Sequence, residues 1–316
     1  MKILVTGSSG FVGSKVMEQA SRIGWECIGQ RRTLNRTNHS QSDFVTSLEA
    51  NTDWRLALNG VDCVVHCAAR VHQMQDSAQD ALTLYRDVNT AGTLNLARQA
   101  VEAGVKRFIF ISSIKVNGEY SKTDQPFRPE TSFIPDDPYG LSKYEAEQGL
   151  KKLADETGLE VVIIRPPLVY GEGVKANFLS MIQWVEKGIP LPLGLIHNKR
   201  SLVYLGNLVD LIMSCCTHTN APGNTFLVSD DLDVSTTEIL KTIANSLAVP
   251  SRLLPIPERV LKTLFIITGK KSMAQRLCCD LHVDISETKR TLNWSPPYTF
   301  QQGIQKTVSA YLHNKK

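Results

Sequence analysis

Short, mainly apolar runs alternate with amphipathic stretches through the first half of the chain. The apolar runs lie at residues 2–6, 26–30, 61–67, 107–111 and 159–165. Stretches with helical periodicity separate them, at 14–23, 87–103 and 139–157. Strands of a parallel sheet are covered on both faces by helices, so they are apolar along most of their length. The pattern therefore predicts the α/β class, with a doubly wound parallel sheet.

The alternation becomes less regular after Gly171. A helical stretch at 177–187, a rigid loop at 191–194 and a strand at 202–205 follow, and a helix begins at Asn207. The remainder is rich in proline and ends in a helix. We expect one large domain at 1–171, to which 200–228 return, and a smaller C-terminal α/β lobe made of 172–199 and 229–316.

A glycine-rich turn joins the first strand to the first helix. Gly7, Gly10 and Gly13 are spaced three apart, with Phe11 and Val12 between the last two. Such glycines allow a tight turn and a close approach of the backbone to a diphosphate, while the N–H groups of the following helix face the anion. The position between strand and helix favours a dinucleotide site over a plain turn.

The end of the second strand indicates which dinucleotide binds. Arg31 and Arg32 stand where NAD-binding chains place a carboxylate for the adenosine ribose, and arginine pairs with the additional 2′-phosphate of NADP. We therefore favour NADP(H) over NAD as the NAD(P) cofactor, although two solvated arginines would give the same pattern. Asp43 and Phe44, on a third strand, are expected beside the adenine.

Small and polar residues follow the next strands. Ala68 and Ala69 end the run at 61–67 and would let the cofactor approach, and Ser112-Ser113 end the run at 107–111. Ligands of open parallel sheets bind beyond the carboxyl ends of the strands, so this serine pair is placed for chemistry. Asn89 is either a cofactor contact or an ordinary helix residue.

A tyrosine and a lysine stand four residues apart at the start of a predicted helix. Asp137 suits the N-cap and Pro138 the first helical position. Tyr139 and Lys143 then share one face of the helix, where the ammonium would favour the phenolate and bring the Tyr139 pKa into a working range for acid–base chemistry.

Composition and charge exclude several classes of protein. The chain has 316 residues, 42% hydrophobic and 21% charged, with a net charge of +4 that is too dispersed for a nucleic-acid groove but suits an anionic small substrate. Cys63, His66 and Cys67 lie in a buried run, so we expect no metal site. Reduced thiols and the lack of a signal peptide predict a cytoplasmic location. The apolar run at 260–268, interrupted by Lys262, is too short to cross a membrane, and no membrane contact is expected.

Taken together, the motifs resemble the extended short-chain dehydrogenase/reductase superfamily, in its branch of nucleotide-sugar epimerases, dehydratases and reductases. The resemblance covers almost the whole chain. It rests on Thr6-Gly7-x-x-Gly10-x-x-Gly13, Ser112-Ser113, Tyr139-x-x-x-Lys143, Arg165-Pro166-x-x-Val169-Tyr170-Gly171, Arg200-x-x-Val203-Tyr204-Leu205 and Leu292-Asn293-Trp294.

The resemblance implies a Rossmann domain for NAD(P) and a C-terminal lobe for a UDP-sugar, with the active site between them. Tyr139 would be the acid/base, Lys143 would hold the nicotinamide ribose, and Ser113 would bond the reacting oxygen. Pro166 is expected to line the cofactor site. The residues implied for the substrate are Ser113, Lys115, Asn177, Leu193 and Arg200. Asn177 and Arg200 fall where the family binds the nucleotide diphosphate, Leu193 would flank the nucleobase, and Lys115 would reach a substrate phosphate or only solvent.

Two departures from the family pattern shape the predicted reaction. Ile114-Lys115 stand where 4,6-dehydratases resemble one another in carrying an acidic pair, so dehydration is not expected. Asn117 stands where many 4-epimerases have tyrosine. We therefore predict NADPH-dependent reduction of a UDP-4-keto-6-deoxy-hexose. Two alternatives are considered beside it. One is a UDP-hexose 4-epimerase with tightly held NAD, and the other is a non-catalytic dinucleotide-binding regulator. The resemblance also implies a homodimer, formed through the helices at 87–103 and 139–157.

Overall fold

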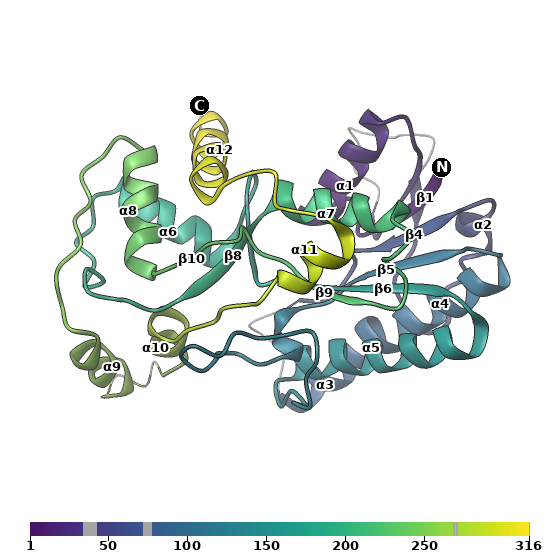
Figure 1. Ribbon diagram of the computed structural model, residues 1–316, viewed down its shortest axis with the longest axis horizontal. Helices are drawn as coiled ribbons and strands as arrows, with labels where there is room; N and C mark the ends of the chain where they lie inside the picture. Colours follow the sequence, from purple (N-terminus) through teal and green to yellow (C-terminus); the bar gives the residue numbers. More distant parts are fainter. Residues whose placement is uncertain (34–42, 72–77, 268, 270, 316) are drawn as a thin grey trace.

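A computed structural model describes residues 1–33, 43–71, 78–267, 269 and 271–315. Its centre is a seven-stranded sheet in which every neighbouring pair is parallel, in the order β3-β2-β1-β4-β5-β6-β9 (Figure 1). The strands are β1 (Lys2–Thr6), β2 (Glu26–Arg31), β3 (Asp43–Val45), β4 (Cys63–His66), β5 (Arg107–Ile111), β6 (Glu160–Arg165) and β9 (Thr225–Leu227). The strand order reverses between β1 and β4, and this is where a doubly wound sheet binds its ligand. The predicted fold class is confirmed.

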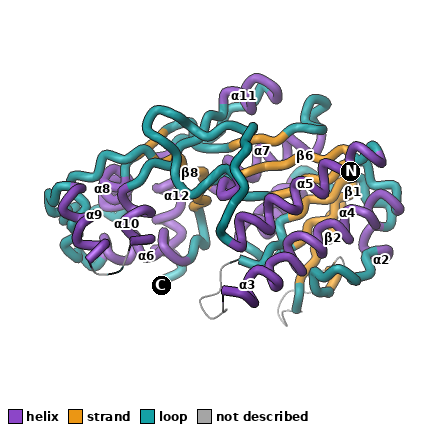
Figure 2. The backbone as a smooth tube through the Cα atoms, turned by 90° about the horizontal axis from the view of Figure 1, so that it is seen from below, coloured by secondary structure: helices purple, strands orange, loops and turns teal. Residues whose placement is uncertain are grey.

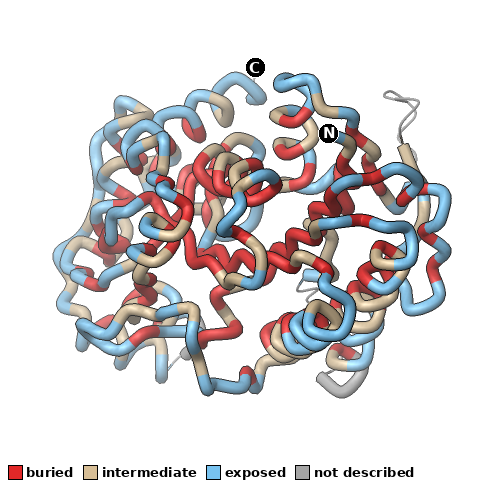
Figure 3. Tube along the Cα trace, turned by 45° about the vertical axis from the view of Figure 1, so that its right-hand side comes forward, coloured by how far each residue is buried: buried red, intermediate tan, exposed pale blue. Residues whose placement is uncertain are grey.

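Helices cover both faces of this sheet because alternate strand residues point to opposite sides. Ile3 and Val5 of β1 join the core under α1 (Phe11–Arg22) and α7 (Leu205–Thr217), whereas Leu4 faces α4 (Thr93–Glu102) and α5 (Pro138–Thr157). Figure 2 shows α4 and α5 running side by side across the second face, with α3 (Ala78–Tyr85) next to them. Buried residues concentrate along the central strands (Figure 3).

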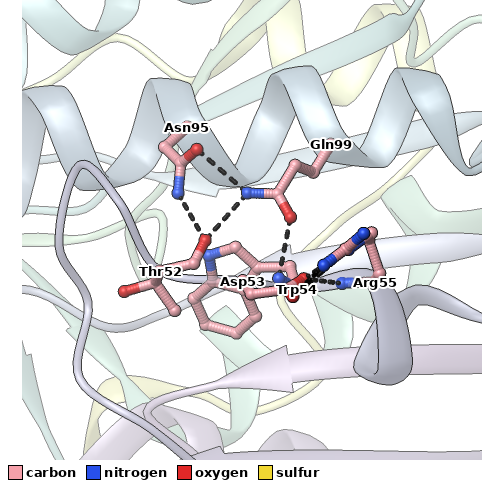
Figure 4. A network of polar contacts seen from close by, with 6 residues as sticks. All are labelled: Thr52, Asp53, Trp54, Arg55, Asn95 and Gln99. Atoms are coloured by element: carbon pink, nitrogen blue, oxygen red, sulfur yellow. Dashed lines mark hydrogen bonds and ion pairs between the residues drawn. The ribbon is translucent and has the colours of Figure 1, made fainter.

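A polar network fixes the short helix α2 (Arg55–Leu58) against α4. The Trp54 N–H donates to Gln99 Oε1 at 2.7 Å, and the Thr52 carbonyl accepts hydrogen bonds from Asn95 and Gln99, each at 2.8 Å (Figure 4). Trp54 is fully buried. These contacts satisfy the loop's backbone groups where they lie against the helix.

The helical region before α4 differs from the prediction of one helix at 87–103. The structure has α3, then a π-helical segment (Arg86–Gly92), then α4. Gly92 packs so closely on the loop before α2 that a Cβ would lie 3.0 Å from the Leu48 carbonyl oxygen. Insertions of π-helix often occur at functional sites, and this one carries Asn89.

The second lobe has its own core and a three-stranded sheet in the order β10-β8-β7. In Figure 1 it lies on the side of the main sheet opposite α2. The segment 200–228 is divided between the two lobes. Strand β8 pairs in the small sheet, whereas β9 pairs in the main sheet and α7 packs against the main sheet. The lobe's strands and helices are β7 (Leu168–Tyr170), β8 (Arg200–Tyr204), β10 (Asp233–Val234), α6 (Ala176–Glu186), α8 (Thr236–Ser246), α9 (Glu258–Ile267), α10 (Lys271–Cys278) and α12 (Phe300–His313), and α11 (Ser286–Leu292) contacts β9.

Within the described residues, no helix has both the length and the apolar character needed to cross a bilayer. The exact domain limits stay a prediction.

Candidate active site

The glycine turn has the close packing that its sequence predicts. Gly7 adopts a left-handed conformation with φ of +64°, and a Cβ there would lie 3.0 Å from the backbone of Ala68. A Cβ on Gly13 would collide with the Gly7 carbonyl oxygen. The helix α1 begins after Gly10 without a side-chain cap. Its first N–H groups are therefore available to an anion, beside the end of β4.

A glutamine that the sequence analysis missed connects this turn to the edge of the sheet. Gln30 is buried, accepts a hydrogen bond from the Gly7 N–H at 3.0 Å and donates to the Thr46 carbonyl at 2.6 Å. The Ser8 hydroxyl donates to the Gln30 carbonyl at 2.9 Å. An amide side chain suits position 30 because the residue there must both accept and donate a hydrogen bond.

Arg31 and Asp43 form an ion pair at this edge, with 2.6 Å between Arg31 Nη2 and Asp43 Oδ1. Arg31 Nε and Asp43 Oδ2 are both buried, and neither has a hydrogen-bond partner among the described residues. Buried polar atoms rarely stay unpaired in a protein that performs its function, so these two atoms fit a polar ligand such as an adenosine moiety. Arg32 is exposed. Phe44 packs into the core, its ring 5.7 Å from that of Trp54.

A buried histidine joins three elements at the point where the strand order reverses. His66 Nδ1 lies 2.7 Å from Thr6 Oγ1, and His66 Nε2 lies 2.9 Å from Thr93 Oγ1. Burial, with a smaller contribution from Lys143, lowers the pKa of His66 to about 3, so the ring is neutral. Thr6 also accepts from the Ala68 N–H at 3.1 Å. His66 therefore links β1, β4 and α4 at this edge of the sheet, and both of its ring nitrogens lie against threonine hydroxyls.

The side chain of Asn89 is hydrogen bonded within the protein. Its Oδ1 accepts from the Arg70 N–H at 2.8 Å, and its Nδ2 donates to the Arg70 carbonyl at 3.1 Å and to Ser142 Oγ at 3.0 Å. The amide is thereby satisfied by the protein. Asn89 thus positions the segment after Ala69 against α5, and a contact of Asn89 with the cofactor stays a prediction.

The start of α5 follows the predicted pattern. Asp137 is the N-cap and accepts from the Gly140 N–H at 3.1 Å, and Pro138 occupies the first turn. Lys115 Nζ lies 3.0 Å from Asp137 Oδ1 and 3.2 Å from Glu119 Oε1. Burial would lower the Lys115 pKa, but the two carboxylates outweigh it and raise the value. The charge of Lys115 is therefore compensated within the protein, close to Tyr139.

Tyr139 is half-buried, and the Ser113 hydroxyl lies close to its phenol. Burial raises the pKa of Tyr139 to about 12, and the Ser113 hydroxyl acts against this rise. Its ring also packs edge-on against that of Tyr85, with 6.0 Å between the centroids. The predicted depression of this pKa by Lys143 is wrong for the chain alone, because desolvation is the larger effect.

Lys143 is 1% exposed, and its Nζ lies 3.9 Å from the centroid of the Phe110 ring. Burial lowers the pKa of Lys143 to about 7, while Glu147 and Cys67 raise it. The Lys143 ammonium acts to lower the pKa values of both His66 and Cys67, so it lies near the end of β4 as well as near Phe110 of β5. A buried cation at this edge is suited to hold a polar group of a ligand.

A buried ion pair that sequence reasoning missed supports this helix. Arg165 Nε lies 2.9 Å from Glu147 Oε1, and Glu147 also accepts from Ser112 Oγ. Arg165 Nη1 donates to Asn117 Oδ1 at 3.0 Å. Glu147 and Arg165 are 0% and 2% exposed. The only available signal was Glu147 one turn after Lys143, and nothing in the sequence identifies its partner.

The residues predicted to bind substrate lie in different environments. Asn177 is exposed at the start of α6, and Arg200 begins β8, donating to the Cys279 carbonyl at 3.3 Å. Pro166 follows β6, and its carbonyl accepts from the Ile114 N–H at 3.0 Å. Leu193 is 4% exposed in the core of the second lobe. Its side chain packs in that core, and the place of Leu193 beside the nucleobase stays a prediction.

Residues 3–229 match the model of the NAD dependent epimerase/dehydratase family. The chain belongs to this family. The match confirms the resemblance inferred from the motifs and makes the chain an NAD-dependent enzyme of the nucleotide-sugar class, so a purely regulatory role is not carried forward. In the part of the chain that the structure describes, no cluster of three His, Cys, Asp or Glu side chains is suited to hold a metal.

Similar proteins act on activated sugars. The chain is 50% identical over 313 residues to a UDP-glucose 4-epimerase from Vibrio cholerae, covering 98% of this chain and 95% of the relative. It is 29% identical over 335 residues to an N-acetyl-alpha-D-glucosaminyl-diphospho-ditrans,octacis-undecaprenol 4-epimerase from Escherichia coli, covering 99% and 96%. The fold matches the crystal structure of UDP-N-acetylglucosamine 4-epimerase from Bacillus cereus, with a TM-score of 0.78, 22% identity and 98% coverage of both chains.

The residues present fit a dinucleotide. The glycine turn offers uncapped N–H groups to its diphosphate, the orphaned atoms of Arg31 and Asp43 offer polar contacts to its adenosine end, and Lys143 is placed for its second ribose. When bound, the nicotinamide ring supplies hydride transfer. The family supports NAD as the cofactor, and the preference for NADP(H) stays a prediction.

Proposed function

We propose that the chain is a UDP-hexose 4-epimerase that interconverts the C4 epimers of UDP-glucose or UDP-N-acetylglucosamine with NAD that it retains. One observation carries the proposal: Ser113 and Tyr139, both half-buried, and the buried Lys143 lie together near the end of β5, in a chain half identical to a UDP-glucose 4-epimerase over nearly its full length. Such identity across both the cofactor domain and the substrate lobe supports a shared reaction.

In this proposal Tyr139 removes the proton from the C4 hydroxyl and returns it after the ketone has turned over. A bound NAD would accept the C4 hydride and would return it to the opposite face of the ketone. Ser113 donates a hydrogen bond to the oxygen at C4 and stabilises the charge that develops there. Lys143, held over Phe110, orients the ribose and stabilises the phenolate. The raised pKa of Tyr139 means that the phenolate needs this positive charge and that of an oxidised nicotinamide before it acts as a base.

Reduction of a UDP-4-keto-6-deoxy-hexose is the second candidate. Two residues noted in the sequence, Asn117 and Arg31, give it less support in the structure. Asn117 was noted because many 4-epimerases have tyrosine there; its side chain bonds Arg165 and donates to the Arg128 carbonyl at 2.6 Å. It is therefore used in the scaffold. Arg31, the expected partner of a 2′-phosphate, is already paired with Asp43. The absence of dehydratase acids at Ile114-Lys115 still fits both reactions.

A sugar diphosphate attached to a polyprenol is the alternative substrate class. The Escherichia coli relative acts on such a compound by its name, and it aligns with 99% of this chain. An exposed apolar helix of the substrate lobe, α9, is the specific feature that favours it. Arg200 would serve the diphosphate in either substrate.

Product analysis separates these possibilities. Purified protein is mixed, without added dinucleotide, with UDP-glucose, UDP-N-acetylglucosamine or a polyprenyl-diphosphate N-acetylglucosamine, and the C4 configuration is read by NMR. The proposal expects conversion of a UDP-sugar to its galacto epimer. No conversion of either UDP-sugar would refute it, and NADPH oxidation on a UDP-4-keto sugar would then establish the reductase.

Mass spectrometry of the nucleotide released from the purified protein tests NAD against NADP. The homodimer through the π-helical segment, α4 and α5, and the cytoplasmic location, stay predictions. Light scattering of the purified chain tests the first.

A further inference from the structure

The helix α9 presents apolar residues outward. Val260, Leu264 and Ile267 are 56%, 54% and 77% exposed, and their spacing of four and three residues places them on one face of the helix. The outward face of a surface helix normally carries polar residues. Contiguous exposed apolar surface of this kind marks a site of contact with another apolar surface.

The opposite face of α9 already attaches the helix to its lobe. Leu261 is 2% exposed in the lobe core, and Phe265 packs against the same core. Lys262 and Glu258, one turn apart, form an ion pair at the side. The exposed face is therefore not needed to hold α9 in place, and the main packing partner of α9 is α10.

Further exposed apolar side chains lie on the same segment, 251–278. Leu254 on the preceding loop is 47% exposed, Ile266 on α9 is 60% exposed, and Met273 on α10 is 42% exposed. We name these residues, with the three above, the α9 face. In Figure 1 α9 lies at the outer edge of the substrate lobe, far from α2 at the opposite end of the molecule. A flat surface can therefore reach it without meeting the cofactor domain.

The charge of the segment indicates what this surface is. Residues 251–278 contain one acidic residue, Glu258, and a net charge of +5, which exceeds the +4 of the whole chain. Among the residues that the structure describes there with their side chains, Arg252, Arg259 and Arg276 are exposed and basic, and Lys262 is paired with Glu258. Apolar side chains flanked by basic ones are the signature of a helix that lies in the interface of an anionic bilayer. Two copies of so positive a face would repel each other across a symmetric interface.

We propose that the α9 face docks the enzyme on the surface of an anionic membrane, with Val260 and Ile267 entering the headgroup region and the basic residues contacting lipid phosphates. This proposal goes beyond the proposed function. It departs from the expectation of no membrane contact, which was argued only from the lack of a helix that could span the membrane. The chain after α10 connects this face to the predicted diphosphate site, since the Cys279 carbonyl accepts from Arg200. Docking therefore places the substrate lobe, and not the cofactor domain, against the bilayer.

Sedimentation with lipid vesicles tests the proposal. The full chain is mixed with vesicles of phosphatidylglycerol and phosphatidylcholine, or of phosphatidylcholine alone, at low and high salt. Binding is expected on the anionic vesicles, weakened by salt. The double variant Val260→Asn, Ile267→Asn should bind at least about tenfold more weakly, and Arg259→Gln with Arg276→Gln should lose the preference for anionic lipid. The control is Leu56→Asn on α2, which replaces an 85% exposed leucine and should bind like the unmodified chain.

Circular dichroism and turnover of a UDP-sugar in solution verify that each variant is folded. Vesicle binding is scored without turnover, so the proposal and the proposed function fail separately. Equal binding by the Val260→Asn, Ile267→Asn variant would overturn the proposal, as would no binding of the unmodified chain. A change in oligomeric mass of that variant, with no vesicle binding by the unmodified chain, would instead assign the face to a second copy.

Discussion

Replacing Arg165 by methionine leaves the carboxylate of Glu147 buried without its partner. Glu147 is fully buried, and Arg165 supplies two of its contacts while a third comes from Ser112. The pair joins the middle of α5 to the end of β6, two turns from Tyr139. The change therefore tests how the orientation of α5 is maintained.

The expected loss is large. Breaking a buried ion pair by removing one partner costs about 3–5 kcal/mol, because the remaining charge is desolvated without compensation. That is a substantial fraction of the roughly 5–15 kcal/mol by which a domain is stable. Replacing both residues, as in Glu147→Leu with Arg165→Met, removes the unpaired charge. The double variant should therefore be more stable than Arg165→Met alone.

Urea denaturation followed by circular dichroism measures these differences, and turnover at saturating substrate reports on the position of Tyr139. The matched control is Arg55→Met, which breaks an ion pair to Asp53. The side chains of this pair are 82% and 57% exposed, so the change should have little effect on stability. If Arg165→Met is no more destabilising than Arg55→Met, the buried pair does not anchor α5 and this reasoning fails.

Three further predictions concern the site itself. Tyr139→Phe should lower kcat by about 10²–10⁴-fold while the dinucleotide still co-purifies, and unchanged turnover would exclude Tyr139 as the acid/base. Burial lowers the Lys143 pKa from 10.5 to about 7, so between these values the unfolded chain binds more protons and stability should rise with pH, by about 5 kcal/mol in all. Lys143→Leu should abolish this rise in urea titrations across the range, and an identical pH profile would contradict it. Gly13→Ala should abolish dinucleotide binding, measured by fluorescence, because its Cβ collides with Gly7, whereas Ser14→Ala on the exposed side of the same turn should bind normally.

The elements that the sequence predicts best are those whose causes are local. The apolar runs of β1, β5 and β6 and the Asp137-Pro138 start of α5 depend on neighbouring residues, and the structure has them where expected. The turn at Gly7 is likewise set by its own glycines.

The parts that could not be predicted depend on partners distant in sequence. His66 bonds a threonine 60 residues before it, and Glu147 pairs with an arginine from another element. The contact of Asn89 with Arg70 could not be predicted because it is fixed only by the fold. The burial of Leu193 could not be predicted because a loop's sequence does not state which side of it faces the core. The Tyr139 pKa moved opposite to expectation because burial, unlike the Lys143 spacing, is not visible in the sequence.

The most direct test of the central claim follows one hydrogen atom. UDP-glucose labelled with deuterium at C4 is incubated with the purified chain in ordinary water and without added dinucleotide, and the product is analysed by NMR. If Tyr139 moves only the hydroxyl proton while a retained dinucleotide carries the hydride, the galacto epimer keeps its deuterium at C4. Loss of the deuterium to solvent, or no epimer at all, would contradict the account.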